Sequence, residues 1–345
     1  MTVAILGPTG FTGRLVVAEA RRAGLAVRLV GRDREALEEL ARGEDVRVAD
    51  ARDLGALREA LDGAQVVLSC AGPFFALGPA PVEAAVAAGA HYLDTSGEQA
   101  WVMLLHERLA GPAAAAGVVV LPAFGFDYVP GDLAARVAAE RLPGPLDEII
   151  VAYSVQHVGT SRGTRRTIGA VMGQSQLAYE DGRLVPSRFG ATTRRVRFPF
   201  GERTVVEWSG TEPLTVPRHT DVRSVRSYVR APAIAAHMGG LGRLAAPFAR
   251  LASRVGPQGP SERSRARSRF AVVAEARGAG GEARAVVTGS DVYGLTALLL
   301  VRGAEALLRG EARGAGVLAA AEAFDAHALA ASLAPLLSIE PDSSS

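Results

Sequence analysis

The first part of the chain alternates short apolar runs with alanine-rich stretches whose apolar residues recur at helical spacing. The apolar runs occupy residues 2–6, 26–30, 46–49, 65–70, 91–94 and 118–124. Such alternation is typical of a parallel sheet whose strands are connected by helices. We therefore predict a Rossmann-type, doubly wound α/β domain over residues 1–129.

Beyond Pro130 the pattern changes to longer β-prone stretches, at residues 148–157, 196–208, 224–229, 269–276 and 282–288. The last two flank Gly278-Ala-Gly-Gly281, which indicates a hairpin. The alternating arginines of residues 263–269 are typical of an edge strand. This region predicts a second α+β domain with a largely antiparallel sheet over residues 130–291, for substrate binding or dimerisation.

Two helical stretches close the chain, at residues 292–308 and 318–333. We expect them to pack on the first domain, so that residues 292–335 complete it. The serine-rich end, residues 340–345, is expected to be a disordered tail.

A glycine-rich turn follows the first apolar run, and a helical stretch begins at Arg14. Glycine allows a sharp turn and lets the backbone approach a pyrophosphate, while the N-terminus of the following helix offers free N–H groups. The predicted dinucleotide-binding residues of this turn are Gly7, Thr9, Gly10, Phe11, Thr12 and Gly13. Because the spacing is GxxGxxG rather than GxGxxG, an ordinary strand-to-helix turn remains the alternative.

The second strand ends at Gly31-Arg32-Asp33, where NAD-binding domains carry an acid for the ribose 2′-hydroxyl. A guanidinium instead suits a 2′-phosphate, because it is always charged and binds phosphate oxygens in pairs. We therefore predict NADP as cofactor, with Gly31 and Arg32 beside the 2′-phosphate. The alternatives are that Arg32 is a solvated surface residue and that Asp33 caps the next helix or binds the ribose. Asp50 and Ala51 are expected beside the adenine, unless Asp50 caps a helix.

Ligands of such sheets lie beyond the carboxyl ends of the strands, and three later strands end in small or polar residues. The predicted cofactor contacts there are Cys70, Ala71, Gly72, Pro73 and Phe74 after the fourth strand, Ser96 and Gly97 after the fifth, and Gly125 and Phe126 after the sixth. We interpret Cys70 as a small buried hydrophobe rather than a nucleophile, because no partner histidine is identifiable.

The amino-acid composition excludes several catalytic mechanisms and kinds of binding site. All 38 basic residues are arginine; the lack of lysine excludes Schiff-base catalysis, a Walker-type phosphate lysine and the Tyr-x-x-x-Lys pair of short-chain dehydrogenases. The single cysteine excludes an intrachain disulfide and a multi-cysteine metal site, and no metal is expected. A net charge of +2 does not indicate nucleic-acid binding. The start of the chain is unlike a signal peptide, and no apolar run reaches the roughly 20 residues of a membrane span, so we expect a cytoplasmic protein.

Six elements follow one another along the chain. They are Gly7-x-x-Gly-x-x-Gly13, Gly31-Arg32, Ala71-Gly-Pro-Phe74, His91-Tyr-Leu-Asp-x-x-Gly-Glu98, Gly125-Phe-Asp-x-x-Pro130-x-Asp132 and Gly289-x-Asp-x-Tyr-Gly-Leu-Thr296. Together they resemble the saccharopine dehydrogenase-like oxidoreductases, and within that group the bacterial trans-acting enoyl reductases. The resemblance runs from residue 1 to about residue 335 and is weakest over residues 180–265. It implies an NADP-binding Rossmann domain, a second domain that covers the cofactor, and hydride transfer.

The resemblance does not favour saccharopine as substrate. Certain lysine-pathway members are thought to use a catalytic lysine, which this chain lacks. Arg162, Arg165 and Arg166 are the nearest basic cluster, and a solvated helix start is the alternative reading of them. If functional, these arginines would hold a phosphate or carboxylate of a carrier- or CoA-linked substrate. The resemblance to the trans-acting enoyl reductases instead implies an apolar unsaturated substrate, such as a polyketide, isoprenoid or lipid intermediate.

Reduction of a polarised C=C bond requires a hydride at one carbon, a proton at its neighbour and a donor to the developing enolate oxygen. We predict Tyr128, Asp127 and Glu98 as catalytic residues, the first two because they lie at a strand end and a domain junction. Glu98 could also orient the nicotinamide amide. Further candidate donors are Tyr153, His157 and Tyr293. Ordinary structural roles in a sheet, a turn or a first helical turn are the alternative for each residue.

Other functions remain open at this level. An imine or ketone reductase would share nearly every feature, and a redox sensor would bind NADP without turnover. The basic amphipathic stretch 239–255 could associate weakly with a membrane surface, although such helices more often cover a domain core. A homodimer is a further option.

Overall fold

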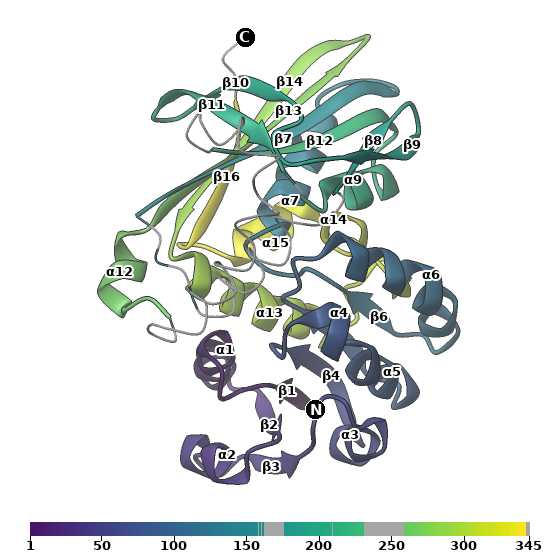
Figure 1. Ribbon diagram of the computed structural model, residues 1–345, viewed down its shortest axis with the longest axis vertical. Coiled ribbons are helices and arrows are strands. Elements are labelled where there is room, and N and C mark those ends of the chain that lie inside the picture. The colour runs from purple at the N-terminus through teal and green to yellow at the C-terminus, as the bar shows by residue number, and fades with distance from the viewer. Residues whose placement is uncertain (158, 160, 162–175, 209, 231–258, 343–345) are drawn as a thin grey trace. The chain divides into compact units, whose positions relative to one another are not determined.

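The computed structural model describes residues 1–157, 159, 161, 176–208, 210–230 and 259–342 (Figure 1). The chain forms two compact units. The first comprises Met1–Ser96, Ala100–Phe126 and Tyr293–Leu318, and the second Gly97–Gln99, Asp127–Val292 and Ala319–Ser345. The arginines at 162–166 and the amphipathic stretch 239–255 lie outside the described residues.

The first unit contains a seven-stranded parallel sheet, which confirms the predicted doubly wound fold. Its strands are β1 (Thr2–Leu6), β2 (Ala26–Gly31), β3 (Asp45–Val48), β4 (Ala64–Ser69), β5 (His91–Asp94), β6 (Val119–Leu121) and β15 (Gly316–Val317). Their order is β15-β6-β5-β4-β1-β2-β3, so the chain changes direction across the sheet between β1 and β4. In open α/β sheets the ligand crevice forms at such a reversal, beyond the carboxyl ends of the strands.

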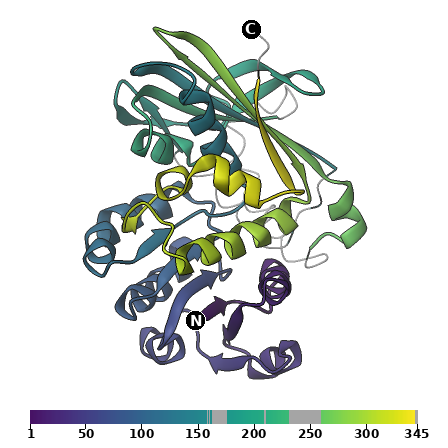
Figure 2. The same cartoon turned by 180° about the vertical axis from the view of Figure 1, so that it is seen from behind.

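Helices connect these strands and bury their apolar faces against the sheet. They are α1 (Phe11–Arg22), α2 (Arg34–Leu40), α3 (Leu54–Leu61), α4 (Phe74–Leu77), α5 (Pro79–Ala87), α6 (Gln99–Ala115) and α13 (Val292–Leu308). The long helix α13, labelled in Figure 1 and seen from behind in Figure 2, closely approaches β5 and the segment that follows β6. A Cβ on its Gly303 would lie 2.7 Å from Leu93 and 2.8 Å from Phe124, so glycine is needed for this approach.

The second unit contains a mixed, mostly antiparallel sheet, which confirms the α+β prediction. Its strands are β7 (Leu146–Gln156), β8 (Gln176–Glu180), β9 (Arg183–Ser187), β10 (Thr193–Phe198), β11 (Gly201–Glu207), β12 (Val222–Arg230), β13 (Arg269–Gly278), β14 (Gly281–Ser290) and β16 (Leu337–Asp342). Seven of them follow the order β10-β11-β12-β7-β13-β14-β16, while β8 pairs with β12 and β9. The pairing of β12 with β7 is parallel, and β13 and β14 form the predicted hairpin.

The two faces of β7 have different neighbours because successive side chains of a strand point in opposite directions. Ile150 and Ala152 join one apolar core with Phe198 and Tyr228. Tyr153, which points the other way, meets helix α7 (Val129–Ala139). The remaining helices of the unit are α9 (Glu212–Thr215), the 3-10 helix η1 (Val216–Arg218), α12 (Glu262–Arg267), α14 (Ala320–Ala323) and α15 (Ala326–Ser332).

Local hydrogen bonding corrects two of the predicted elements. The stretch 196–208 is not one strand, because β10 and β11 fold into a hairpin. The arginine alternation at 263–269 is mostly helical rather than an edge strand: Ser261 caps α12 by accepting a hydrogen bond from the Ser264 N–H at 3.3 Å.

The C-terminal region and the boundary between the units also differ from the expectation. Residues 319–335 group with the second unit instead of completing the first. The expected helix over 318–333 is interrupted because Asp325 caps α15, accepting hydrogen bonds from the His327 and Ala328 N–H groups. Glu340–Asp342, expected in a disordered tail, pair with β14 as the end of β16. The first unit ends at Phe126 rather than at residue 129.

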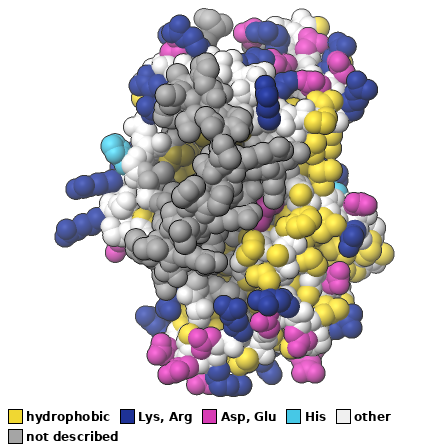
Figure 3. Space-filling view, viewed as in Figure 1, with side chains coloured by type: hydrophobic (Ala, Val, Ile, Leu, Met, Phe, Trp, Pro, Cys, Tyr) yellow, Lys and Arg dark blue, Asp and Glu magenta, His cyan; other side chains and the backbone are white. Residues whose placement is uncertain are grey.

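The surface carries charged side chains on both units, while apolar side chains gather over the region of α4 to α6 (Figure 3). Phe75 is 56% exposed and Met103 39% exposed in these helices. Among the described residues, no helix combines the length and the apolar character that crossing a membrane requires.

Candidate functional site

The glycine turn joins β1 to α1, and its three glycines have different surroundings. Gly7 has a φ of 76°, in the left-handed region, and a Cβ there would lie 3.2 Å from the Ala71 Cβ after β4. A Cβ on Gly13 would lie 2.2 Å from the Gly7 carbonyl oxygen. A Cβ on Gly10 would meet only that oxygen, at 3.4 Å, which is an ordinary contact. The fold therefore requires glycine at positions 7 and 13, whereas Gly10 leaves space for a ligand.

The N-terminus of α1 is available to an anion. Gly10 is its N-cap residue, no side chain caps the helix, and its first turn contains no acid. The first N–H groups of a helix lack partners within the helix and carry partial positive charge. Gly10 is exposed, and Thr9, Phe11 and Thr12 are half-buried around it. This geometry fits the pyrophosphate of a dinucleotide.

Arg32 follows β2, is exposed, and has no hydrogen bond or ion pair with another residue in the described ranges. The carboxylate of Asp33 accepts a hydrogen bond from the Ala36 N–H at 3.1 Å and caps α2. Arg34 pairs with Glu38. Within the part of the chain that the structure describes, the Arg32 guanidinium next to Gly31 is therefore unpaired, as a 2′-phosphate site requires.

Asp50 and Ala51 lie in the turn after β3. The Asp50 carboxylate accepts a hydrogen bond from the Arg52 N–H at 2.9 Å. It does not cap a helix, because Asp53 caps α3. Both predicted adenine contacts are half-buried and stay a prediction.

The segment after β4 lies against the glycine turn through the contact between Ala71 and Gly7. Gly72 and Pro73 are exposed, whereas the side chain of Phe74 belongs to the apolar core, so only the backbone of Phe74 can face a ligand. Burial raises the pKa of the Cys70 thiol to about 12. Cys70 is therefore a neutral thiol, in agreement with its interpretation as a small hydrophobe.

Asp94 organises the ends of β5 and β6 and was not among the predicted site residues. Its buried carboxylate accepts hydrogen bonds from the N–H groups of Ser96 and Ala123, both at 2.9 Å, and from the Trp101 indole at 2.7 Å. The Ser96 hydroxyl also accepts from the Ala123 N–H, at 3.0 Å. These bonds fix the loop that carries Ser96, and burial raises the pKa of Asp94 against their opposing effect.

The late motif that ends at Thr296 holds two predicted cofactor segments in place. The Phe126 N–H donates to the Thr296 hydroxyl at 3.1 Å, and Gly125 leaves room for the methyl group of Thr296. Tyr293 meets the Phe11 ring edge-on, with centroids 5.1 Å apart. Tyr293 is therefore a packed aromatic of the first unit.

A buried carboxyl is the most unusual feature of the second unit. Glu212 is fully buried; its Oε1 lies 2.5 Å from the Tyr153 hydroxyl and its Oε2 accepts from the Ser227 hydroxyl at 2.6 Å. The Tyr153 oxygen also accepts from the Gly131 N–H at 3.1 Å. Burial raises the pKa of Glu212 to about 7, against the lowering effect of its bonds to Ser227 and Tyr153. Near neutral pH this carboxyl is therefore partly protonated.

Three aromatic rings border this carboxyl. Trp208 stacks on Tyr128 with centroids 6.1 Å apart and planes 15° apart, and meets Tyr153 edge-on at 6.0 Å. The Tyr128 hydroxyl donates to the Gly97 carbonyl at 2.7 Å. Burial raises the pKa of Tyr128 and Tyr153 well above the ordinary value, and the nearby acids act in the same direction. Both tyrosines are neutral phenols.

The structure brings the three predicted catalytic residues into one region. Tyr128 contacts Gly97, and the Glu98 carboxylate accepts from the Gly97 N–H at 2.9 Å. Asp127 is next to Tyr128 in the chain; its side chain reaches solvent, yet desolvation by the surrounding protein raises its pKa to about 6. His157 is exposed beyond the end of β7.

A second buried pair in this unit has a structural role. Asp132 Oδ1 lies 3.1 Å from His219 Nε2, and Asp132 Oδ2 accepts from the Ala321 N–H at 2.8 Å. Burial alone would raise the pKa of Asp132, but the charge and hydrogen bond of His219 and the other bonds lower it. The pair thus ties α7 to η1 and α14.

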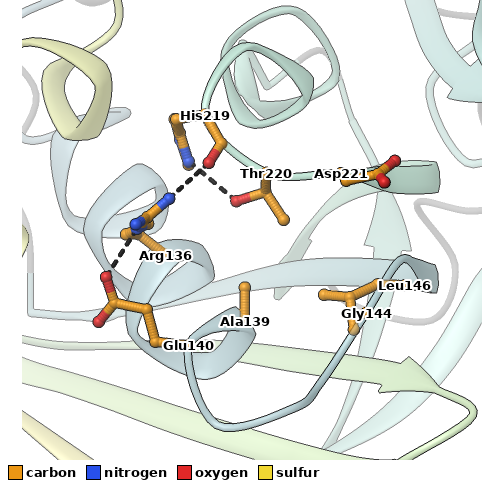
Figure 4. Close-up of a pocket in the computed structure, with 8 residues that line it drawn as sticks. All are labelled: Arg136, Ala139, Glu140, Gly144, Leu146, His219, Thr220 and Asp221. Atoms are coloured by element: carbon orange, nitrogen blue, oxygen red, sulfur yellow. Dashed lines mark hydrogen bonds and ion pairs between the residues drawn. The ribbon is translucent and has the colours of Figure 1, made fainter.

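A shallow surface pocket lies beside this pair (Figure 4). Its arginine, Arg136, donates to the Glu140 carboxylate at 2.7 Å and to the His219 carbonyl at 2.5 Å. Because this guanidinium is already bonded within the protein, we assign no ligand to the pocket.

Sequence reasoning missed the buried polar residues Asp94, Glu212 and Ser227 and the half-buried Trp208. Each draws its role from partners on other elements, and none stands in a motif that indicates burial. Glu212 and Ser227 also fall where the family resemblance is weakest.

The glycine turn gives a matched pair of variants. Gly13→Ala should destabilise the first unit by about 1–3 kcal/mol, because its Cβ collides with backbone. Gly10→Ala should leave the thermal unfolding temperature near that of the parent and weaken NADPH binding at least tenfold. Thermal unfolding and NADPH titration measure the two effects; unchanged affinity in Gly10→Ala would contradict the pyrophosphate site.

The buried carboxyl predicts a pH-dependent stability. The folded pKa of Glu212, about 7, lies above its ordinary 4.5. Its contribution to stability is therefore complete below about pH 4.5, falls as the pH rises, by at most about 1.4 kcal/mol per pH unit, and is lost above about pH 7. The variant Glu212→Gln cannot lose a proton at this position, so it should lack this fall. The unfolding free energy of the parent, measured by urea denaturation, should therefore decrease relative to that of the variant between pH 5 and 8. Parallel curves for both proteins would refute it.

Comparison with known proteins agrees with this geometry. The saccharopine dehydrogenase NADP binding domain family matches residues 3–121. A trans-acting enoyl reductase of Mycobacterium ulcerans is 31% identical over 211 residues, which cover 57% of this chain and 50% of that protein. A lipid droplet localized protein of Caenorhabditis elegans is 34% identical over 162 residues, 43% of this chain and 38% of that protein. The matched region thus spans half or less of these relatives.

A solved structure extends the likeness to the whole fold. Saccharopine dehydrogenase (L-Glu forming) of Saccharomyces cerevisiae aligns over 99% of both chains with a TM-score of 0.64 and 14% identity. At that identity the alignment shows a shared fold. The family match covers residues 3–121, from β1 to β6, so this part of the first unit is similar to the saccharopine dehydrogenase NADP binding domain.

Proposed function

We propose that this protein is an NADPH-dependent reductase that transfers a hydride to a C=C bond of an apolar substrate. The observation that carries the proposal is the exposed guanidinium of Arg32 after β2, which has no partner among the described residues. It belongs to an NADP-binding domain whose Gly10 leaves space for a pyrophosphate. The similarity to a trans-acting enoyl reductase supports a C=C bond as the reacting group.

In this proposal, backbone N–H groups of α1 and the side chain of Arg32 bind the cofactor. The N–H groups at the start of α1 bind the pyrophosphate, because they are uncapped and have no acid beside them. Arg32 binds the 2′-phosphate, while Asp33, held by the Ala36 N–H, stays away from the ribose. When bound, NADPH supplies the hydride.

Asp127 is better suited than Tyr128 to supply the proton. A carboxyl with a pKa of about 6 is partly protonated near neutral pH and can reach a substrate from its exposed position. Tyr128 stays a neutral phenol whose hydroxyl is bonded to Gly97, so it orients its neighbours. As hydride adds to one carbon of the double bond, its electron pair moves toward the conjugated oxygen, and the neighbouring carbon takes the proton from Asp127.

Arg32→Ala should weaken NADPH binding about ten- to a hundredfold, which corresponds to a charge-assisted bond of roughly 1.5–3 kcal/mol. NADH binding should not change, because NADH lacks the 2′-phosphate. Arg34→Ala is the control, since Arg34 is equally exposed and pairs with Glu38. Fluorescence titration measures all four affinities, and an equal loss for both cofactors in Arg32→Ala would exclude contact with the 2′-phosphate.

Oxidation of NADPH should occur with enoyl thioesters or enones and not with imines or saturated ketones. The rate should fall as the pH rises above about 6, because Asp127 loses its proton. Asp127→Asn should lower kcat by about 10²–10⁴ and remove this pH dependence while retaining NADPH affinity. Absorbance assays across such a panel test this; turnover confined to imines or ketones would reassign the reaction, and NADPH binding without any turnover would indicate a sensor.

A further inference from the structure

Trp208 carries a buried hydrogen-bond donor without a partner. Its indole Nε1 is covered from solvent and has no hydrogen bond with any residue that the structure describes, although part of the residue is exposed. An indole N–H can only donate, and a buried donor without an acceptor costs about 1–3 kcal/mol. The other tryptophan of the chain, Trp101, shows the usual arrangement, with its N–H donating to Asp94 at 2.7 Å.

The surroundings hold the Trp208 ring in a defined orientation. Tyr128 stacks on it and Tyr153 meets it edge-on. Its backbone N–H donates to the Ser227 carbonyl at 3.1 Å. Tyr153 is itself fixed by Glu212 and Gly131. A donor fixed in this way loses little conformational freedom when it binds an acceptor.

The charges nearby restrict the acceptor. Three acids, Asp127, Glu212 and Glu98, act electrostatically on Tyr128, the stacking partner of Trp208. Their effect disfavours an anionic ligand. The ligand must therefore accept a hydrogen bond from the N–H group without carrying a negative charge. A neutral acceptor attached to an apolar group fits, because the faces of the surrounding rings are apolar and the indole N–H is polar.

We propose that the Trp208 indole N–H binds the neutral carbonyl oxygen of the substrate, an inference that rests on the proposed function and specifies its substrate as a ketone or thioester. In the reduction, the bond strengthens as the oxygen gains the electron pair of the C=C bond, so Trp208 assists the step as a donor to the enolate oxygen.

The presence of two tryptophans allows a direct binding test. In ¹⁵N-labelled protein the two indole N–H groups give separate NMR signals, and Trp208→Phe assigns them. Dibutyl ketone should move the Trp208 proton signal downfield and leave the Trp101 signal in place. Nonane, which lacks an acceptor, and nonanoate, which is charged, should move it much less. A Trp208 signal that ignores the ketone, or responds equally to nonane, would overturn the proposal.

Kinetics separates this inference from the proposed function. Trp208→Phe keeps an aromatic ring between the tyrosines and should lower kcat/KM for enones by about 10²–10³ at unchanged NADPH affinity. An unchanged kcat/KM would refute the role of Trp208 as a donor to the enolate oxygen. If the parent reduces no panel substrate but the ketone moves the Trp208 signal, the reductase proposal fails and the carbonyl site stands.

Discussion

The close approach of Gly13 to the Gly7 carbonyl oxygen is the constraint on which the first unit depends. It lets α1 begin directly beyond β1, so the uncapped helix terminus lies at the reversal between β1 and β4. The same turn brings Gly7 against Ala71, and Phe11 against Tyr293 of α13. Segments distant in sequence thus meet around one backbone contact that no side chain could occupy.

The two units use different means to prepare their sites. The first presents backbone N–H groups and the Arg32 guanidinium, which has no partner among the described residues, and the buried Asp94 fixes loops. The second relies on side chains: Glu212 is held by two hydroxyls, and the aromatic rings around it are neutral. A buried acid is tolerated in each unit because several hydrogen bonds compensate for the water it has lost.

Much of the fold was predictable because it follows from local pattern. The spacing of apolar runs predicted both sheet types. The dinucleotide site that glycine spacing and Arg32 indicate stays a prediction. The structure decides what local pattern left open, such as the capping role of Asp33. The C-terminal helices were misassigned because an apolar stripe shows that a helix is covered but not by what. The Glu212 cluster joins β7, α9 and β12, and an isolated acid or serine carries no sign of such distant partners.

The strand β16 has a consequence for synthesis of the chain. It pairs along β14 from Leu337 to Asp342, so the backbone groups of β14 are covered by a strand that is made well after β14 itself. Until then those N–H and C=O groups are open to pairing with another chain. The first unit also waits for distant residues, since β15 and α13 follow the whole second sheet except β16. Nascent chains of this protein therefore carry an unpaired sheet edge until residues 337–342 have been made, and shielding of this edge during that interval would protect them from aggregation.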